Sequence, residues 1–161
     1  MRRLILCLIL VFGIMQFSNL AAQDVQLEWL HLGSIADIPM EAALTPEAVL
    51  ALSVNICDSS WNPHVVIDYT SGQTWYMMIY VYNNSSATKS FKIEYDLRYK
   101  DGGNYYVYRT PAVSIAPQSW DSWRINVTSY VAKLGLLTLT GRVYGTGMGN
   151  DNKVTGQVFV F

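Results

Sequence analysis

Two histidines and one cysteine are the residues of this chain best suited to acid–base or nucleophilic chemistry near neutral pH. Cys57 lies shortly before His64, so a thiolate–imidazole pair is conceivable, although only their proximity in the sequence suggests it. His31 lies in a segment of alternating hydrophobicity, and no Gly-x-Ser-x-Gly or other nucleophile motif accompanies either histidine. We therefore predict no catalytic residues and a protein that is not an enzyme.

Acidic side chains offer two further kinds of chemistry, and both are weakly supported. Paired carboxylates can hydrolyse glycosides, but Glu94 and Asp96 share the charged face of an alternating segment, where solvated side chains are expected. The segment Gly145–Asn152 could offer Asp151 and neighbouring asparagines to calcium, but a calcium site usually has several acidic ligands. We interpret that segment as a turn, and we predict neither a metal ion nor a cofactor.

Aromatic side chains are the stronger indication of a function. The chain has 5 tryptophans and 11 tyrosines, more than the core of one small domain requires. Exposed rings stack on sugars or pack against a neighbouring subunit, whereas most rings of a sheet protein lie in its core or in cross-strand pairs. The predicted ligand or subunit contacts are Trp61, Trp75, Tyr76, Tyr106, Trp120 and Trp123.

Alternating hydrophobicity predicts the strands that would position these side chains. From Ser90 to Lys100 apolar and charged residues alternate strictly, which is typical of a half-buried antiparallel strand. Trp75–Tyr82 is apolar on both faces and predicts a central strand. Thr45–Leu52 has the signature of a helix start and predicts one short helix or turn. The spacing of strands and turns predicts an all-β antiparallel sandwich of six to eight strands.

Three segments suggest a family. They are Ile79-Tyr-Val-Tyr-Asn-Asn-Ser, the strand Phe91-x-Ile-x-Tyr-x-Leu, and the step Val113-x-Ile-Ala-Pro-Gln-Ser-Trp. With them, the region 65–161 resembles the bacterial immunoglobulin-like sandwich modules, especially the adhesion-type domains of exported proteins. The resemblance implies an immunoglobulin-like β-sandwich whose role is adhesion, spacing or binding rather than catalysis.

The first 22 residues have the features of an export signal. Arg2 and Arg3 precede the apolar segment Leu4–Phe17, and small residues lead to Ala22. We predict cleavage there and a secreted or cell-surface protein of bacterial type, with a retained N-terminal anchor as the alternative. Residues 23–64 would then form an N-terminal extension, including a first strand, that packs on the sandwich of residues 65–161 of its own copy or completes a sheet edge of a neighbouring copy. Because Cys57 is the only cysteine after the signal, no disulfide can form within one copy.

Charge is distributed unevenly along the chain. No lysine or arginine occurs between Leu4 and Thr88, whereas basic residues outnumber acidic ones from Lys89 onward. Such halves attract each other either within one chain or head to tail between copies. The basic residues are dispersed among acidic ones, so we predict no binding of nucleic acid.

Together these features favour a non-enzymatic, exported structural or adhesive domain that self-associates or binds a surface polymer. It would meet the membrane only through its export signal. A secreted carbohydrate-binding module with a polysaccharide ligand is the first alternative. A small eight-stranded outer-membrane β-barrel is the second, because the chain ends in Val-Phe-Val-Phe161.

Overall fold

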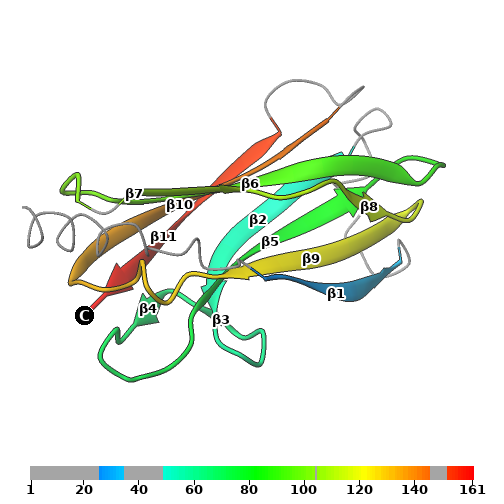
Figure 1. Ribbon diagram of the computed structural model, residues 1–161. Coiled ribbons are helices and arrows are strands. Elements are labelled where there is room, and N and C mark those ends of the chain that lie inside the picture. Colours follow the sequence, from blue (N-terminus) through cyan, green and yellow to red (C-terminus); the bar gives the residue numbers. More distant parts are fainter. Residues whose placement is uncertain (1–25, 35–48, 104, 146–151) are drawn as a thin grey trace, which may run out of the picture.

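The computed structural model describes residues 26–34, 49–103, 105–145 and 152–161. These residues form strands and no helix (Figure 1). Eight of the strands have five or more residues, within the predicted range of six to eight. In chain order the strands are β1 (Leu27–Ser34), β2 (Val49–Cys57), β3 (Pro63–His64), β4 (Val66–Ile67), β5 (Tyr76–Asn83), β6 (Lys89–Tyr99), β7 (Tyr105–Arg109), β8 (Val113–Ile115), β9 (Ser119–Asn126), β10 (Gly135–Tyr144) and β11 (Lys153–Val160).

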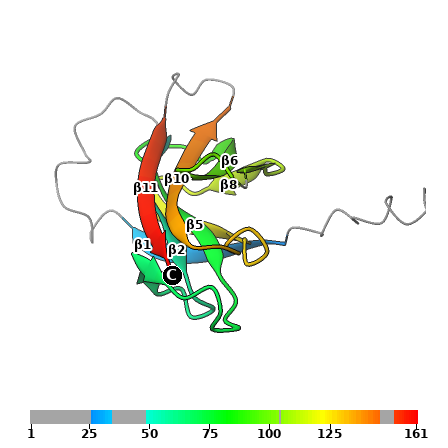
Figure 2. The same cartoon turned by 90° about the vertical axis from the view of Figure 1, so that its left-hand side faces the viewer.

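The strands form two facing sheets, which Figure 2 shows nearly edge-on. Sheet A has the order β1-β9-β5-β2-β3, and sheet B has the order β4-β11-β10-β6-β7, with β8 paired to β6. All pairings between the longer strands are antiparallel, and only the two-residue β4 runs parallel to its neighbour β11 among the described strands. Two separate sheets confirm the predicted β-sandwich.

The strand order is that of an immunoglobulin-like sandwich. In that fold one sheet has the order A-B-E-D and the other contains C-F-G. Here β2, β5 and β9 take the places of A, B and E, while β6, β10 and β11 take those of C, F and G. The prediction of an immunoglobulin-like β-sandwich is therefore confirmed by topology.

The strand at the outer edge of sheet A, next to β9, departs from the immunoglobulin strand order. In the immunoglobulin order that place belongs to strand D, which comes between C and E along the chain. Here β1 occupies it, although β1 precedes every other strand (Figure 1). The segment that would supply strand D instead contains β8, which pairs with β6 of sheet B. Three strands of the segment 23–64, namely β1, β2 and the two-residue β3, thus belong to sheet A itself.

The predicted short helix or turn over Thr45–Leu52 is wrong where the structure describes it, because Val49–Cys57 is the strand β2. Residues 45–48 lie outside the described residues, as does the export signal. Val54 and Ile56 of β2 point into the core. Pairing with β5 along nearly the whole strand therefore outweighs the local helix signature.

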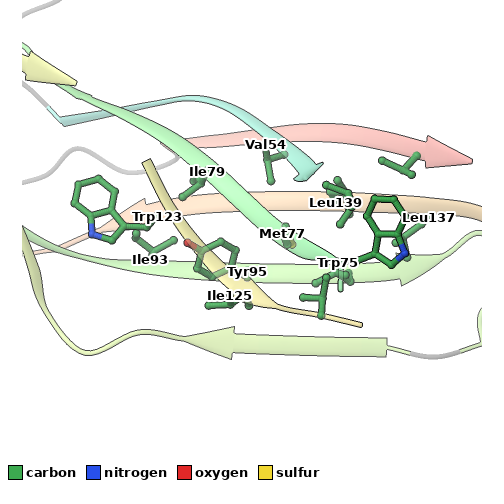
Figure 3. Packing of buried hydrophobic residues seen from close by; sticks show 14 of the residues in the cluster. Val54, Trp75, Met77, Ile79, Ile93, Tyr95, Trp123, Ile125, Leu137 and Leu139 are labelled. Carbon is green, nitrogen blue, oxygen red and sulfur yellow. The ribbon is translucent and has the colours of Figure 1, made fainter. Parts of the chain in front are cut away.

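The core lies between the two sheets. In β6 the alternation predicted from the sequence is realised, with Phe91, Ile93, Tyr95, Leu97 and Tyr99 all buried. Figure 3 shows residues from both sheets meeting in this layer. Most long strands contribute buried residues to this core, whereas β1 contributes only the partly buried Leu27.

Strand β5 is covered on both faces, as its sequence predicts. Met77, Ile79 and Val81 lie in the core, and on the opposite face Met78 and Tyr82 are buried as well. This second buried face lies on the outer side of sheet A. Polar and aromatic side chains gather there.

Candidate interaction site at the junction of β1 and β9

A buried arginine joins β1 to the outer face of sheet A. Arg124, in β9, is only 5% exposed. Its Nε and Nη2 atoms donate hydrogen bonds to Glu28 Oε2 of β1, at 2.9 and 2.6 Å. Its Nη1 atom donates to the backbone carbonyls of Asp58 and Ser59, at 2.9 and 3.1 Å. A guanidinium needs such partners when it is removed from water, and all of these lie far from it in the sequence.

Two aromatic rings enclose the same guanidinium. Its central carbon lies 4.0 Å from the ring centroid of Trp61 and 4.0 Å from that of Tyr76. Both are cation–π distances. Trp61 adopts a left-handed backbone with φ of 68°, which costs a non-glycine residue about 1–2 kcal/mol. The turn that contains Trp61 must therefore be held by other contacts.

Asp58 provides those contacts. Its carboxylate accepts hydrogen bonds from the backbone N–H of Ser60 and from both the backbone and side chain of Asn62, at 2.8–3.1 Å. His64 Nε2 lies 3.2 Å from the same carboxylate. Burial opposes ionisation, but the hydrogen bonds from Asn62, His64 and Ser60 outweigh it and lower the pKa of Asp58 to about 2. The carboxylate thus fixes the turn that presents Trp61 to Arg124.

Acid should weaken the fold partly through Asp58. The pKa of its carboxyl is about 2 in the folded chain and 3.8 ordinarily. Its ionised form therefore stabilises the fold above about pH 4, and this contribution is lost as pH falls from about 4 to 2. Between pH 6 and pH 2.5, the urea midpoint of the unmodified chain should fall further than that of Asp58→Asn. Equal falls in the two proteins would contradict this role. Other carboxylates contribute equally to both and cancel.

A second polar contact fastens β1 on the opposite face of β9. Asp121 is only 2% exposed, and its Oδ1 lies 2.6 Å from His31 Nδ1 in a hydrogen bond. Residues three apart in a strand point to opposite faces. Glu28 and His31 therefore hold β9 from both sides, and each meets a buried charged side chain of β9. The register places Glu28 opposite Arg124 and His31 opposite Asp121.

Apart from these two contacts, β1 is weakly packed. Trp29 is 59% exposed and Leu30 is 37% exposed. Leu27 is the residue of β1 that packs against the core. Among the described strands, β1 packs mainly on β9. Its other edge pairs with no described strand.

The predicted contact residues divide into three groups. Trp61 and Tyr76 come together, half-buried, around Arg124. Trp75 and Trp123 lie in the core at 4% and 3% exposure, and Trp123 meets the Phe91 ring edge-on. Their burial leaves them no surface for a ligand or partner.

The remaining two predicted residues are half-buried. Tyr106 stacks on Tyr130 with ring centroids 3.8 Å apart, and burial raises the pKa of its hydroxyl to about 12. Trp120 lies on the outer face of β9, and its indole nitrogen is buried without a hydrogen-bond partner. The rings that lie over Arg124 are those of Trp61 and Tyr76, not those of Tyr106 and Trp120. The six residues therefore do not form one binding surface.

The residues that sequence reasoning missed are the charged ones, Glu28, Arg124 and Asp121. Only a weak signal existed for them. In Ser119–Asn126 an aspartate and an arginine interrupt a segment that is otherwise suited to a covered strand. Charges there require partners, but the sequence does not identify which residues supply them.

The conceivable thiolate–imidazole pair is not formed. His64 bonds to Asp58, and its ring meets the Trp75 ring edge-on at 5.3 Å. Burial raises the pKa of the Cys57 thiol to about 11, and nearby Arg124 offsets this only in part. The thiol is therefore protonated at neutral pH and is a poor nucleophile.

Neither a metal-binding group of side chains nor a membrane-spanning helix occurs in the part of the chain that the structure describes. In that part no group of three or more His, Cys, Asp or Glu side chains is arranged to hold a metal ion. The calcium alternative at Asp151 lies outside it. No helix long and apolar enough to cross a membrane occurs there either.

Comparison with known proteins gives no family. No family model matches the chain, and no curated protein matches it. Among solved structures, the CARDB domain of the PF1109 protein from Pyrococcus furiosus, crystallised with di-metal ions, is 17% identical with a TM-score of 0.46. That match covers 72% of this chain and 96% of the domain. The apo-form Calx CBD1 domain is 12% identical with a TM-score of 0.36, covering 68% of this chain and 99% of that one.

A third similar structure is the alkylpurine DNA glycosylase AlkC of Pseudomonas fluorescens bound to DNA containing an abasic site analog. It is 15% identical with a TM-score of 0.46, and the match covers 70% of this chain but only 30% of the glycosylase. All three TM-scores lie below 0.5. The assignment of the fold therefore rests on the strand order of the two sheets.

Proposed function

We propose that this chain is a non-enzymatic, exported structural or adhesive domain that associates with further copies of itself through β1. The observation that carries the proposal is the edge of this eight-residue strand that no strand of the described residues covers. β1 contains no lysine, arginine or proline, and it exposes Trp29 and Leu30. Proteins that stay monomeric usually protect such an edge with charges, proline or covering segments, because unpaired N–H and C=O groups attract other strands.

Most other sheet edges are protected in these ways, although β4 pairs only with Phe159 and Val160 and so leaves residues 153–157 of β11, which begin with Lys153, without a described neighbour on that side. β3 and β4 have two residues each, and β3 contains Pro63. β7 is short and ends in Arg109. The open part of β2 is capped by Asn152, whose side chain accepts from the Ala51 N–H and donates to the Val49 carbonyl. The contrast supports β1 as the surface for association.

Size-exclusion chromatography with light scattering on residues 23–161, together with negative-stain microscopy, tests the proposal. We expect dimers or larger ordered assemblies. Leu30→Lys places a charge on the open strand and should shift the protein toward monomers. Leu134→Lys, at a leucine 64% exposed outside the strands, is the matched control and should leave assembly unchanged. A monomer at all concentrations, or equal effects of the two variants, would refute the proposal.

The carbohydrate-binding alternative has a different requirement. It needs exposed rings. Of the six predicted contact residues, Trp61 and Tyr76 are engaged by Arg124, and Trp75 and Trp123 are buried. Retention of a monomeric protein on insoluble polysaccharide would favour that alternative over association.

A further inference from the structure

The end of β1 and the start of β2, which residues 35–48 join in the sequence, lie three strand positions apart in sheet A. Ser34, at the end of β1, lies opposite Ser119 of β9. Ser119 lies opposite Asn83 of β5, which lies opposite Val49 at the start of β2. The end of β1 and the start of β2 therefore share one row, separated by two intervening strands. Figure 1 shows this separation, with blue β1 and cyan β2 on opposite sides of β5 and β9.

The connection is much longer than this separation requires. Three strand spacings of about 4.8 Å amount to about 14 Å. Residues 35–48 number 14, and a chain of that length reaches up to about 50 Å when extended. Its length alone therefore allows β1 to meet β9 of its own copy or of a second copy.

The edge of β9 that pairs with β1 is specific for this strand. Without β1, the guanidinium of Arg124 would lose its carboxylate partner and the carboxylate of Asp121 its hydrogen bond to His31. Both groups are buried, and leaving either without a partner is costly. An incoming strand must therefore carry an acid and a hydrogen-bond donor three residues apart, in antiparallel register. β1 of any copy of this chain meets that requirement.

Exchange between copies preserves every one of these contacts. β1 adds little to the core of its own copy beyond Leu27, since Trp29 and Leu30 are largely exposed. Moving β1 to an identical β9 in another copy replaces each hydrogen bond and ion pair by the same one. Such exchange of an identical element is a low-cost route from monomers to assemblies.

We infer that β1 of one copy occupies the place beside β9 in a second copy, so that each sandwich is completed by its neighbour's N-terminal strand. This inference rests on the proposed function, because it gives one way in which β1 joins copies. Exchange uses the edge of β1 that pairs with β9, and it leaves the other edge of β1 available for a further copy. Reciprocal exchange gives a closed dimer, and sequential exchange gives a chain of sandwiches. In both, Glu28 of one copy pairs with Arg124 of the next.

Disulfide trapping between two differently tagged chains tests the inference. One chain carries Leu30→Cys and the other Ser122→Cys, at positions that the register places opposite each other. Both chains carry Cys7→Ala and Cys57→Ala, so each has one cysteine and neither can form a disulfide within itself. The chains are co-expressed for export, so that any exchange takes place during folding. A disulfide joining the two tags then requires β1 of one chain beside β9 of the other.

The matched control is Asn126→Cys in place of Ser122→Cys. Asn126 lies in the same strand and on the same face, but it is exposed and four residues out of register. We expect the mixed disulfide with Ser122→Cys and only background with Asn126→Cys.

Other outcomes separate the two proposals. Assemblies without the mixed disulfide, or equal trapping at both positions, would overturn strand exchange and leave self-association standing. Monomers without any mixed disulfide would overturn both.

Discussion

Replacing Arg124 by methionine should lower the free energy of unfolding by about 3 kcal/mol, the lower end of the usual effect of breaking a buried ion pair, because the Glu28 side chain left behind is 32% exposed. Methionine fills much of the space between Trp61 and Tyr76, but it cannot donate hydrogen bonds. Glu28 would lose its counterion, and the carbonyls of Asp58 and Ser59 would lose their donor. The loss comes from these unpaired groups rather than from a cavity.

Urea unfolding measures this loss, and Arg109→Met is the control. Arg109 also forms an ion pair, with Nε 2.6 Å from Glu94 Oε2, but its side chain is 66% exposed. An exposed pair contributes only about 0–1 kcal/mol, because water and salt screen it. If both variants lose the same stability, the Arg124 cluster is not the connection between β1, β9 and the Asp58 turn.

The strands of the fold could be predicted from the sequence where the pattern reports burial directly. Ser90–Lys100 alternates because one face meets the core and the other meets water, and β6 follows that pattern. Trp75–Tyr82 is apolar on both faces because β5 is covered on both. A pattern of this kind depends only on the environment of each side chain, so it needs no knowledge of the neighbouring strands.

The start of β2 could not be predicted in this way. Thr45, Pro46 and Glu47 form a local signature of a helix start, but Val49–Cys57 pairs with β5, a strand some 25 residues further along the chain. The register with β5 and the contacts with the core involve distant residues, which local propensity cannot represent. Non-local pairing therefore decided the structure of this segment.

The candidate site was predictable only in part. Trp61 and Tyr76 are predicted as contact residues because their side chains are aromatic, but the sequence does not indicate that the two rings enclose an arginine. Arg124 is 96 residues from Glu28 and 66 from Asp58. Trp75 and Trp123 carried the same aromatic signal and lie in the core. Periodicity shows which residues share a face, but not which face is exposed.

Gly156→Ala should lower the free energy of unfolding nearly as much as Arg124→Met, because it pushes the two sheets apart. Gly156 lies in β11, where a Cβ atom would be 2.5 Å from the backbone carbonyl oxygen of Val54 in β2. A backbone oxygen inside a sheet cannot move aside without shifting its strand. Overpacking of this kind usually costs about 1–3 kcal/mol, and we expect the upper end of that range.

Gly141→Ala is the matched control for this prediction. It lies in the adjacent strand β10, and its added Cβ would meet Ile79 Cδ1 at 2.6 Å, which is the end of a side chain. Ile79 can turn partly away, so the loss should be about 1 kcal/mol. Both variants replace glycine by alanine in a strand, so the change in chain entropy cancels in their comparison. Urea midpoints at unchanged slope give the two losses. A loss at Gly156 no greater than at Gly141 would mean that β2 and β11 can separate freely, and that their close approach does not fix how the two sheets pack.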